Sequence, residues 1–220
     1  VASYSQSFTP TFGVDSNGDP LEPETGEGFK VGIKAELFDG NLLATLSYFN
    51  ITRQNVETSD PIDPFVSVAT GEQKSQGVEL DIVGEILPGW NIIASYAYID
   101  GEVTEDNTIA EGNRLLNVPE HSASLWTTYE IQKGNLQGLG FGLGFNYVGE
   151  RAGDLDNSFE LESYFLTNAA IFYRRDNWQL AINAKNLFDI DYIAGSNNRR
   201  DSGAEAGAPF TIVGSISVEF

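Results

Sequence analysis

The sequence predicts an all-β protein, an antiparallel transmembrane β-barrel, and three observations carry this prediction. Apolar and polar residues alternate with period two along most of the chain, as in strands with one apolar and one polar face. The alternating segments are long, and the connections between them are alternately short turns and long polar loops. The last residue is aromatic, Phe220, and apolar residues stand at every second position back from it to Phe210.

The alternation divides the chain into strands. It is clear where Phe29, Val31 and Ile33 are separated by Lys30 and Gly32. Most of the segments are about twice as long as the usual strand of a globular protein, and a tilted strand of about 9–11 residues crosses a bilayer. About ten strands are expected, at residues 1–8, 27–38, 42–53, 73–87, 90–101, 119–131, 138–150, 163–174, 177–188 and 208–220.

The connections between these strands alternate in length, which is typical of outer-membrane barrels with tight turns on one side and long loops on the other. Turn-forming residues such as Asp39-Gly40 and Pro88-Gly89 occupy the short connections. The long connections are expected near residues 9–26, 54–72, 102–118, 151–162 and 189–207.

Charge follows the same division. The chain has 12 Lys and Arg against 32 Asp and Glu, a net charge of −20, and nearly all of this charge lies in the long connections. A protein this acidic is not expected to bind nucleic acid, which needs a basic surface. The absence of Cys excludes a disulfide framework and a thiolate metal site.

Alternation alone does not say which face of the strands points to water, so a soluble sandwich or lipocalin-like barrel is the simpler alternative. Strand length, aromatic residues near strand ends, and a polar face that includes Gly140, Gly142, Gly144 and Asn146 favour the membrane arrangement. Bacterial outer-membrane proteins characteristically end on an aromatic residue. We therefore expect Phe210, Ile212, Ile216, Val218 and Phe220 to form a C-terminal assembly signal.

Several segments, in this order, resemble the barrel repeats of TonB-dependent receptors, most of all the ferric-siderophore branch with hydroxamate-type ligands. The segments are Glu36 to Leu42 (ELFDGNL), Tyr48 to Val56 (YFNITRQNV), Gly77 to Asp81 (GVELD), Pro88 to Asn91 (PGWN), Ala94 to Tyr98 (ASYAY), Asn117 to Ser122 (NVPEHS), Tyr147 to Arg151 (YVGER), Asn186 to Asp189 (NLFD) with Tyr192, and Val218 to Phe220 (VEF).

The resemblance implies energy-coupled uptake of a ferric siderophore across the outer membrane of a Gram-negative-type bacterium, with the chelate as cargo, no cofactor and no enzymatic activity. Such receptors have about 22 strands around a plug. Residues 1–220 would be one barrel domain holding the last ten strands. The absence of Met and the start at Val1 suit a piece of a longer chain, with the signal peptide, plug and TonB box outside it. A passive pore or structural barrel of ten strands is the alternative.

The same resemblance implies the partners: the ferric siderophore, the TonB complex through the plug and TonB box, the barrel-assembly machinery, and outer-membrane lipid and lipopolysaccharide. Aromatic and Arg side chains often contact the organic ligand in such receptors. The candidates at or near long connections are Arg114, Tyr192, Arg199 and Arg200. The last two could equally serve to balance the charge of an acidic loop.

Three other patterns are weaker. His121 stands beside Ser122, but neighbouring residues of a strand point to opposite faces, which argues against a catalytic pair. Asp15 to Asp19 begins like a calcium-binding EF-hand loop, but Pro20 takes the position that requires Gly. Weak binding of a divalent cation near Asp15, Asp19 and Glu22 stays open. Glu79 and Asp81 are expected to share the polar, lumen-facing side.

Overall fold

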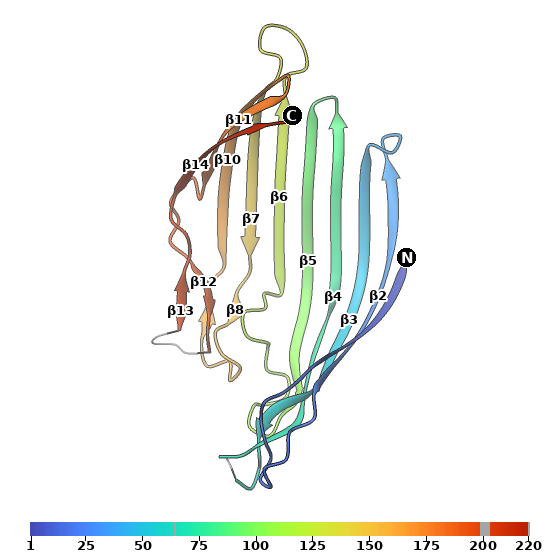
Figure 1. The fold of residues 1–220 in the computed structure, drawn as a ribbon, viewed down its shortest axis with the longest axis vertical. Coiled ribbons are helices and arrows are strands. Elements are labelled where there is room, and N and C mark those ends of the chain that lie inside the picture. Colours follow the sequence, from blue (N-terminus) through green and yellow to red (C-terminus); the bar gives the residue numbers. More distant parts are fainter. Residues whose placement is uncertain (64, 199–202, 220) are drawn as a thin grey trace.

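The computed structural model describes residues 1–63, 65–198 and 203–219, and these residues form strands and loops (Figure 1). None of the described residues lies in a helix that is long and apolar enough to span a membrane. The strands are β1 (Ala2–Thr9), β2 (Glu24–Leu37), β3 (Leu42–Ser59), β4 (Ser67–Leu87), β5 (Trp90–Glu105), β6 (His121–Glu130), β7 (Leu139–Val148), β8 (Arg151–Ala152), β9 (Glu160–Leu161), β10 (Tyr164–Arg175), β11 (Trp178–Lys185), β12 (Ile193–Ser196), β13 (Ala204–Ala206) and β14 (Thr211–Val218).

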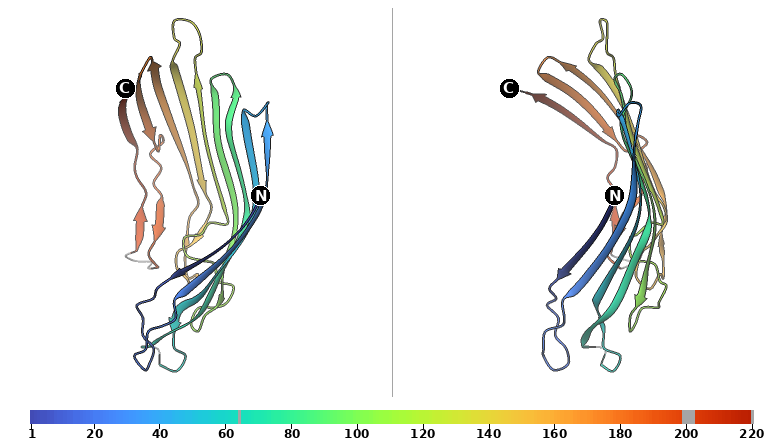
Figure 2. Two further views of the ribbon diagram at one scale, coloured as in Figure 1. Left: turned by 45° about the vertical axis from the view of Figure 1, so that its right-hand side comes forward. Right: turned by 90° about the vertical axis from the view of Figure 1, so that its right-hand side faces the viewer.

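Ten of these strands make one antiparallel sheet in the order β1-β2-β3-β4-β5-β6-β7-β10-β11-β14. Each overlaps one of the ten strands that the sequence predicts, so the predicted meander is confirmed. In the described part of the chain β1 and β14 are the two free edges of the sheet. The alternative of a closed ten-stranded barrel is therefore wrong for this structure. Figure 2 shows the physical reason: the single layer bends as a shallow arc, as the wall of a wider barrel does.

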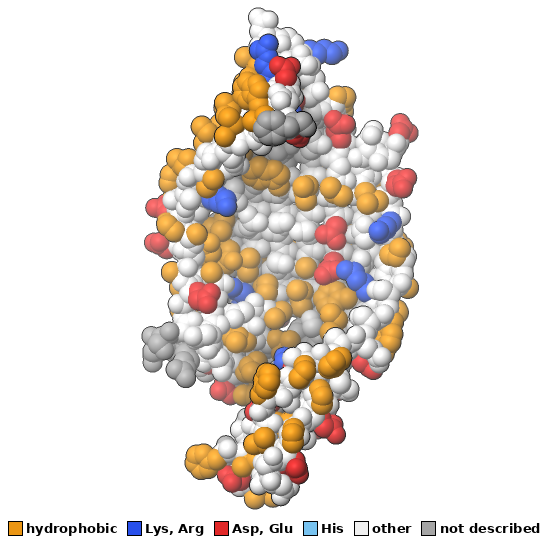
Figure 3. Space-filling view, in the orientation of Figure 1, with side chains coloured by type: hydrophobic (Ala, Val, Ile, Leu, Met, Phe, Trp, Pro, Cys, Tyr) orange, Lys and Arg blue, Asp and Glu red, His pale blue; other side chains and the backbone are white. Residues whose placement is uncertain are grey.

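The register gives the sheet one polar and one apolar face. Asp81, Ser95, Ser124 and Asn146 lie opposite one another across β4, β5, β6 and β7. One residue along, an apolar row crosses the same strands, made of Ile82, Ala94, Leu125 and Phe145. Figure 3 looks onto the hollowed, concave face, where acidic and basic side chains lie among uncharged ones. The apolar side chains on the convex face stay exposed, as a lipid-facing surface requires.

The paired strands extend well beyond the predicted boundaries at one end. β3 continues to Ser59 and β4 begins at Ser67, so the long connection predicted at 54–72 shrinks to residues 60–66. The register shifts between Arg53 and Val56, around Asn55, which has φ of +58°. Beyond this bulge both faces carry polar residues. The period-two pattern therefore ends although the backbone pairing continues.

Two small hairpins lie inside segments that the sequence predicts as long connections. β8 pairs with β9 within 151–162, and β12 pairs with β13 within 189–207. Strands of two to four residues are too short to show a period. The ninth predicted strand, 177–188, ends earlier, at Lys185, and the last one, 208–220, starts later, at Thr211.

Aromatic rings from neighbouring strands pack against glycines on the concave face. A Cβ atom on Gly144 would lie 2.5 Å from the ring of Trp126, and one on Gly142 would lie 2.7 Å from the same ring. A Cβ atom on Gly140 would lie 2.1 Å from the ring of Phe172. These glycines therefore let large rings lie flat against the wall of the sheet.

Candidate ligand-binding site

The two ends of the sheet differ in construction. Short turns close the strands at the upper end in Figure 1, for example at Asp39 and Gly40, whose φ angles are +55° and +88°. The long acidic connections gather at the lower end. Residues that could hold a ligand are found in two places: on the polar concave wall and among the long connections.

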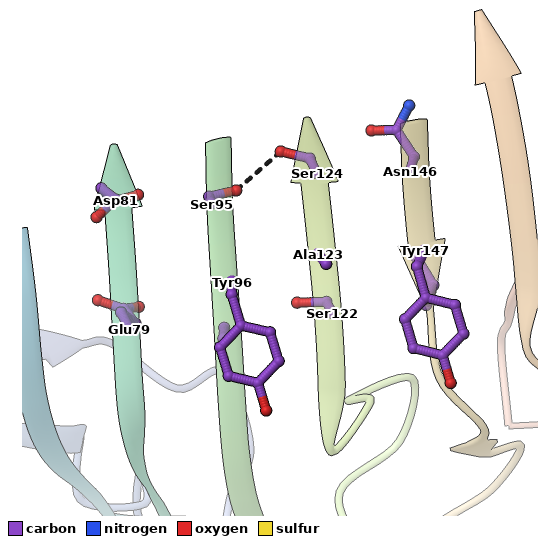
Figure 4. Close-up of a pocket in the computed structure, with 11 residues that line it drawn as sticks. Glu79, Asp81, Ser95, Tyr96, Ser122, Ala123, Ser124, Asn146 and Tyr147 are labelled. Atoms are coloured by element: carbon purple, nitrogen blue, oxygen red, sulfur yellow. Dashed lines mark hydrogen bonds between the residues drawn. The ribbon is translucent and has the colours of Figure 1, made fainter. Parts of the chain in front are cut away.

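A groove of about 390 Å³ lies on the polar wall across β4, β5, β6 and β7 (Figure 4). The Oγ atoms of Ser95 and Ser124 are hydrogen-bonded at 2.8 Å, and Glu79 forms an ion pair with Lys30. Glu79 and Asp81 share this face, as the sequence predicts. The groove presents hydroxyl, amide and carboxylate groups. The residues that line it are Glu79, Asp81, Ser95, Tyr96, Ala97, Ser122, Ala123, Ser124, Asn146, Tyr147 and Val148.

Three connections interlock at the other end, and we name residues 113–119, 149–161 and 192–198 the loop cluster. Asn117 holds two of them together. Its Nδ2 donates to the carbonyl of Ser196 at 2.7 Å, and its Oδ1 accepts from the amide of Ser196 at 2.8 Å. Asn117 has φ of +63°, a conformation that Asn tolerates better than most residues. Both the side chain and the backbone preference of Asn117 therefore suit this position.

Arg151 lies at the centre of the loop cluster and is only 3% exposed. Its two Nη atoms donate to the carbonyls of Ala194 and Ile193, each at 2.8 Å. The guanidinium carbon lies 5.4 Å from the ring centroid of Tyr164. A buried cation is costly unless its donors are used. The two Nη atoms of Arg151 fix β12 against β8, whereas the buried Nε makes no hydrogen bond with the described residues. The sequence places Arg151 in a long connection, but none of the residues next to it in the sequence indicates that its side chain is buried.

Tyr192 joins the same group. Its ring lies 4.4 Å, centroid to centroid, from the ring of Tyr164, which also stacks under Arg151. Gly207 makes room for the Tyr192 ring, since a Cβ atom there would come within 2.1 Å of it. The predicted candidate Tyr192 is thus packed against Tyr164, whose ring also contacts Arg151.

Arg114 lies in a different part of the loop cluster. Its guanidinium forms an ion pair with Glu160, and its amide donates to Oδ1 of Asn157 at 2.8 Å. The side chain of Arg114 is 30% exposed, so water and a ligand can reach it. The other two candidates, Arg199 and Arg200, lie outside the described residues.

The residues of the predicted C-terminal signal lie partly in β14 and partly outside it. Ile212, Ile216 and Val218 stand at alternate positions of β14 and are exposed on the apolar face. Phe210 precedes β14, and its amide donates to Oδ1 of Asp189 at 2.7 Å. Phe220 lies outside the described residues. A role of these residues in assembly remains a prediction.

The acidic loops hold their carboxylates with backbone amides. Oδ1 of Asp15 accepts from the amides of Asn17 and Asp19 at 2.8 and 2.9 Å, and these bonds lower the pKa of Asp15. Asp106 is partly buried, which raises its pKa, but bonds from Ile109, Thr108 and Thr58 outweigh the burial and the net pKa is lowered. The described residues contain no group of three or more His, Asp or Glu side chains arranged to hold a metal ion.

His121 faces the apolar side of the sheet. Its Nδ1 is 2.9 Å from the hydroxyl of Tyr96, and its ring lies 5.2 Å from that of Tyr98. Ser122 and Ser124 line the groove on the other face. The prediction that His121 and these serines do not share a face is confirmed, and His121 belongs to an aromatic group.

The fold and its two polar regions agree with a family of membrane receptors. The family model described as TonB dependent receptor-like, beta-barrel matches residues 1–187. The chain therefore belongs to the TonB-dependent receptor barrels, and the family that the sequence segments resemble is confirmed. Barrels of this family are outer-membrane proteins, as the sequence predicts.

The individual relatives are receptors and transporters. The metal-pseudopaline receptor CntO of Pseudomonas aeruginosa UCBPP-PA14 is 44% identical over 90% of this chain, which covers 28% of that receptor. The ferrichrome outer membrane transporter/phage receptor of Escherichia coli K12 is 36% identical over 89% of the chain and 27% of its own length. The chain thus spans less than a third of these relatives.

A solved structure gives the same picture. The siderophore receptor PiuA of Acinetobacter baumannii superposes with a TM-score of 0.82 at 28% identity, over 98% of this chain and 33% of that one. The open arc of ten strands is therefore equivalent to about a third of such a receptor.

Proposed function

We propose that this chain is part of a receptor that takes up a ferric siderophore across the bacterial outer membrane with energy from the TonB complex. The proposal is supported by the match of residues 1–187 to the family model of TonB-dependent receptor barrels, and by relatives that are named as receptors or transporters for metal chelates. The open sheet argues against a passive ten-stranded pore, because a pore needs a closed wall.

The geometry supports binding of a polar chelate at the loop end. Arg151 and Tyr164 are packed beneath Tyr192 and shape the loop cluster from within, whereas Arg114 stays partly accessible. Accessible aromatic and guanidinium groups, here Tyr192 and Arg114, suit planar, oxygen-rich ligands because they offer a stacking surface and paired donors. The polar wall around Ser95 and Ser124 would continue this hydrophilic path into the barrel.

The remaining partners belong to the proposal as well. Contact with the TonB complex would be made by parts of a longer receptor outside these 220 residues. The barrel-assembly machinery would act on the strand that ends the chain, and lipid and lipopolysaccharide would cover the convex face. The acidic loops would face outward, with divalent cations between them and lipopolysaccharide phosphates.

The test is uptake of ⁵⁵Fe-labelled siderophores by cells that express the complete reading frame containing this chain. We expect saturable uptake of one chelate from a panel of hydroxamate, catecholate and pseudopaline complexes, and its loss when TonB is deleted. Neutralising Arg199 and Arg200 together should weaken uptake about tenfold, while neutralising Lys133 at a short turn should leave it unchanged. Uptake that persists without TonB would contradict the proposal.

A further inference from the structure

The apolar face of the sheet carries a groove of about 410 Å³ across β10, β11 and β14. The lipid-facing side chains that line it are Leu139, Ile171, Tyr173, Leu180 and Ile182. The backbone of Gly214, which has no side chain, completes the groove. Phe172, Ala181 and Ser215 lie between these rows, and their side chains alternate to the concave face. The groove is therefore a gap in the lipid-facing surface.

Gly214 causes this gap. It lies opposite Ile182, which lies opposite Ile171, so an apolar row across the three strands ends in a position without a side chain. A Cβ atom built on Gly214 meets no atom of the described residues within 4 Å on the side of β11, and on its other side β14 is the edge of the sheet. Its neighbours on the same face, Ile212 and Ile216, are 61% and 69% exposed and rise on both sides of the gap.

The short-turn end of the groove has the features of a membrane interface. The rings of Tyr173 and Trp178 meet edge to face at 5.7 Å, an amphipathic pair of the kind that lies at headgroup level. Arg175 follows on the same face, opposite Trp178. The side chain of Arg175 is 67% exposed, and its contact with Asp176 is 4.0 Å long, at the limit for an ion pair.

The neighbouring cation is held differently. Arg174 points to the concave face, where it donates to Glu130 at 2.9 Å and to Gln179 at 3.1 Å. Arg175 is thus the cation that this turn offers to the lipid side. From Gly214 to Val218, which is level with Trp178, the strand rises about 13 Å. This distance is close to half the hydrocarbon thickness of a bilayer, about 15 Å.

We propose that the groove binds one anionic phospholipid of the leaflet at the short-turn side, with an acyl chain in the gap at Gly214 and the phosphate at Arg175. The inference rests on the proposed placement in the outer membrane. The cation selects an anionic headgroup, and the apolar gap selects an acyl chain. The site holds this lipid longer than the surrounding surface does, because both ends of the molecule are recognised.

Native mass spectrometry of the complete receptor, purified from outer membranes and titrated with defined lipids, tests this site. Wild-type receptor should retain one phosphatidylglycerol with about tenfold preference over phosphatidylethanolamine. Arg175→Gln should remove the preference for the anionic lipid. Gly214→Leu should fill the gap and remove retention of either lipid, whereas Arg174→Gln on the concave face should change nothing.

Equal retention of both lipids by the wild type, or unchanged retention in Arg175→Gln, would overturn the inference. Arg175 is exposed, so this variant keeps the test valid if Gly214→Leu fails to assemble. Binding of the ferric siderophore is measured on the same samples. Retained siderophore binding without lipid selectivity rejects the lipid site alone, whereas absence from the outer-membrane fraction rejects the proposed function as well.

Discussion

The wall of the sheet and the loop cluster are held together in opposite ways. In the wall, consecutive strands pair residue by residue, and the side chains simply alternate between a polar and an apolar face. In the loop cluster, a few polar side chains bind backbone groups from distant parts of the chain, such as Asn117 on Ser196 and Arg151 on Ile193 and Ala194.

The difference shows where stability is concentrated. Loss of one residue in the wall leaves the neighbouring ladder of hydrogen bonds in place. Loss of one anchor in the loop cluster removes hydrogen bonds between segments that no regular ladder of strand pairing connects, such as those of the buried Arg151. We therefore expect the loops to depend on single residues and the wall to depend on packing.

The largest effect is expected at Arg151. Replacing it with Met removes two charge-assisted hydrogen bonds, each worth about 1.5–3 kcal/mol, and takes the guanidinium donors away from the carbonyls of Ile193 and Ala194. Local opening of the loop cluster should become easier by about 3 kcal/mol. Hydrogen exchange of residues 192–198, followed by mass spectrometry on the receptor, measures this change.

Arg151→Lys is the matched control, because it keeps the charge but lacks the planar pair of donors. It should give an intermediate exchange rate. Exchange of β6 and β7 should stay at the wild-type rate in both variants. Unchanged protection of 192–198 in Arg151→Met would show that the loops do not depend on this anchor.

The difference between the wall and the loop cluster also explains why the strands can be predicted from the sequence and the loop contacts cannot. Ten strands follow from alternation and turn residues, because both are local properties of the chain. The loop-side ends of β3 and β4, residues 56–59 and 67–72, carry polar residues on both faces, so their pairing leaves no periodic signal. The sequence does not single out Arg151, since its burial depends on carbonyls more than 40 residues away.

The candidate ligand residues follow the same rule. Tyr192 and Arg114 lie at the loop end, and connection length is enough to predict this position. Their different partners, Tyr164 for one and Glu160 for the other, come from the folding of the loops onto each other. Residue type and position in the chain could not predict these contacts.

A smaller effect is expected in the wall, at Gly144. A Cβ atom there lies 2.5 Å from the ring of Trp126, so Gly144→Val should force the indole from its place. Overpacking of this kind costs about 1–3 kcal/mol. Thermal unfolding of the receptor in detergent should show a lowered Tm, and the tryptophan fluorescence should change.

Gly214→Ala is the control for this substitution. It adds a side chain to another glycine of the same sheet, but the new Cβ meets no atom of the described part of the chain within 4 Å. Its Tm should match the wild type. Equal losses from the two substitutions would mean that glycine itself, and not the matched ring, supports the wall.

The smallest effect concerns pH at Asp106, where the extended end of the wall meets the loops. Its Oδ1 accepts from Oγ1 of Thr58 and from the amides of Thr108 and Ile109, at 2.8, 2.8 and 2.9 Å. Because these bonds hold its pKa below the ordinary value of 3.8, the charged form stabilises the turn. This contribution is complete above pH 3.8 and is lost as the pH falls through the lower, folded-state pKa.

Pepsin cleavage near Ile109, compared with that of Asp106→Asn from pH 5 to pH 2, measures the loss. The variant does not titrate at this position, so the ratio of the two rates removes the pH dependence of the protease itself. Wild-type cleavage should be the slower of the two at pH 5, and the rates should converge below pH 3.8. A constant ratio would show that the charge of Asp106 does not hold the turn, and the loops would then depend on neutral anchors such as Asn117.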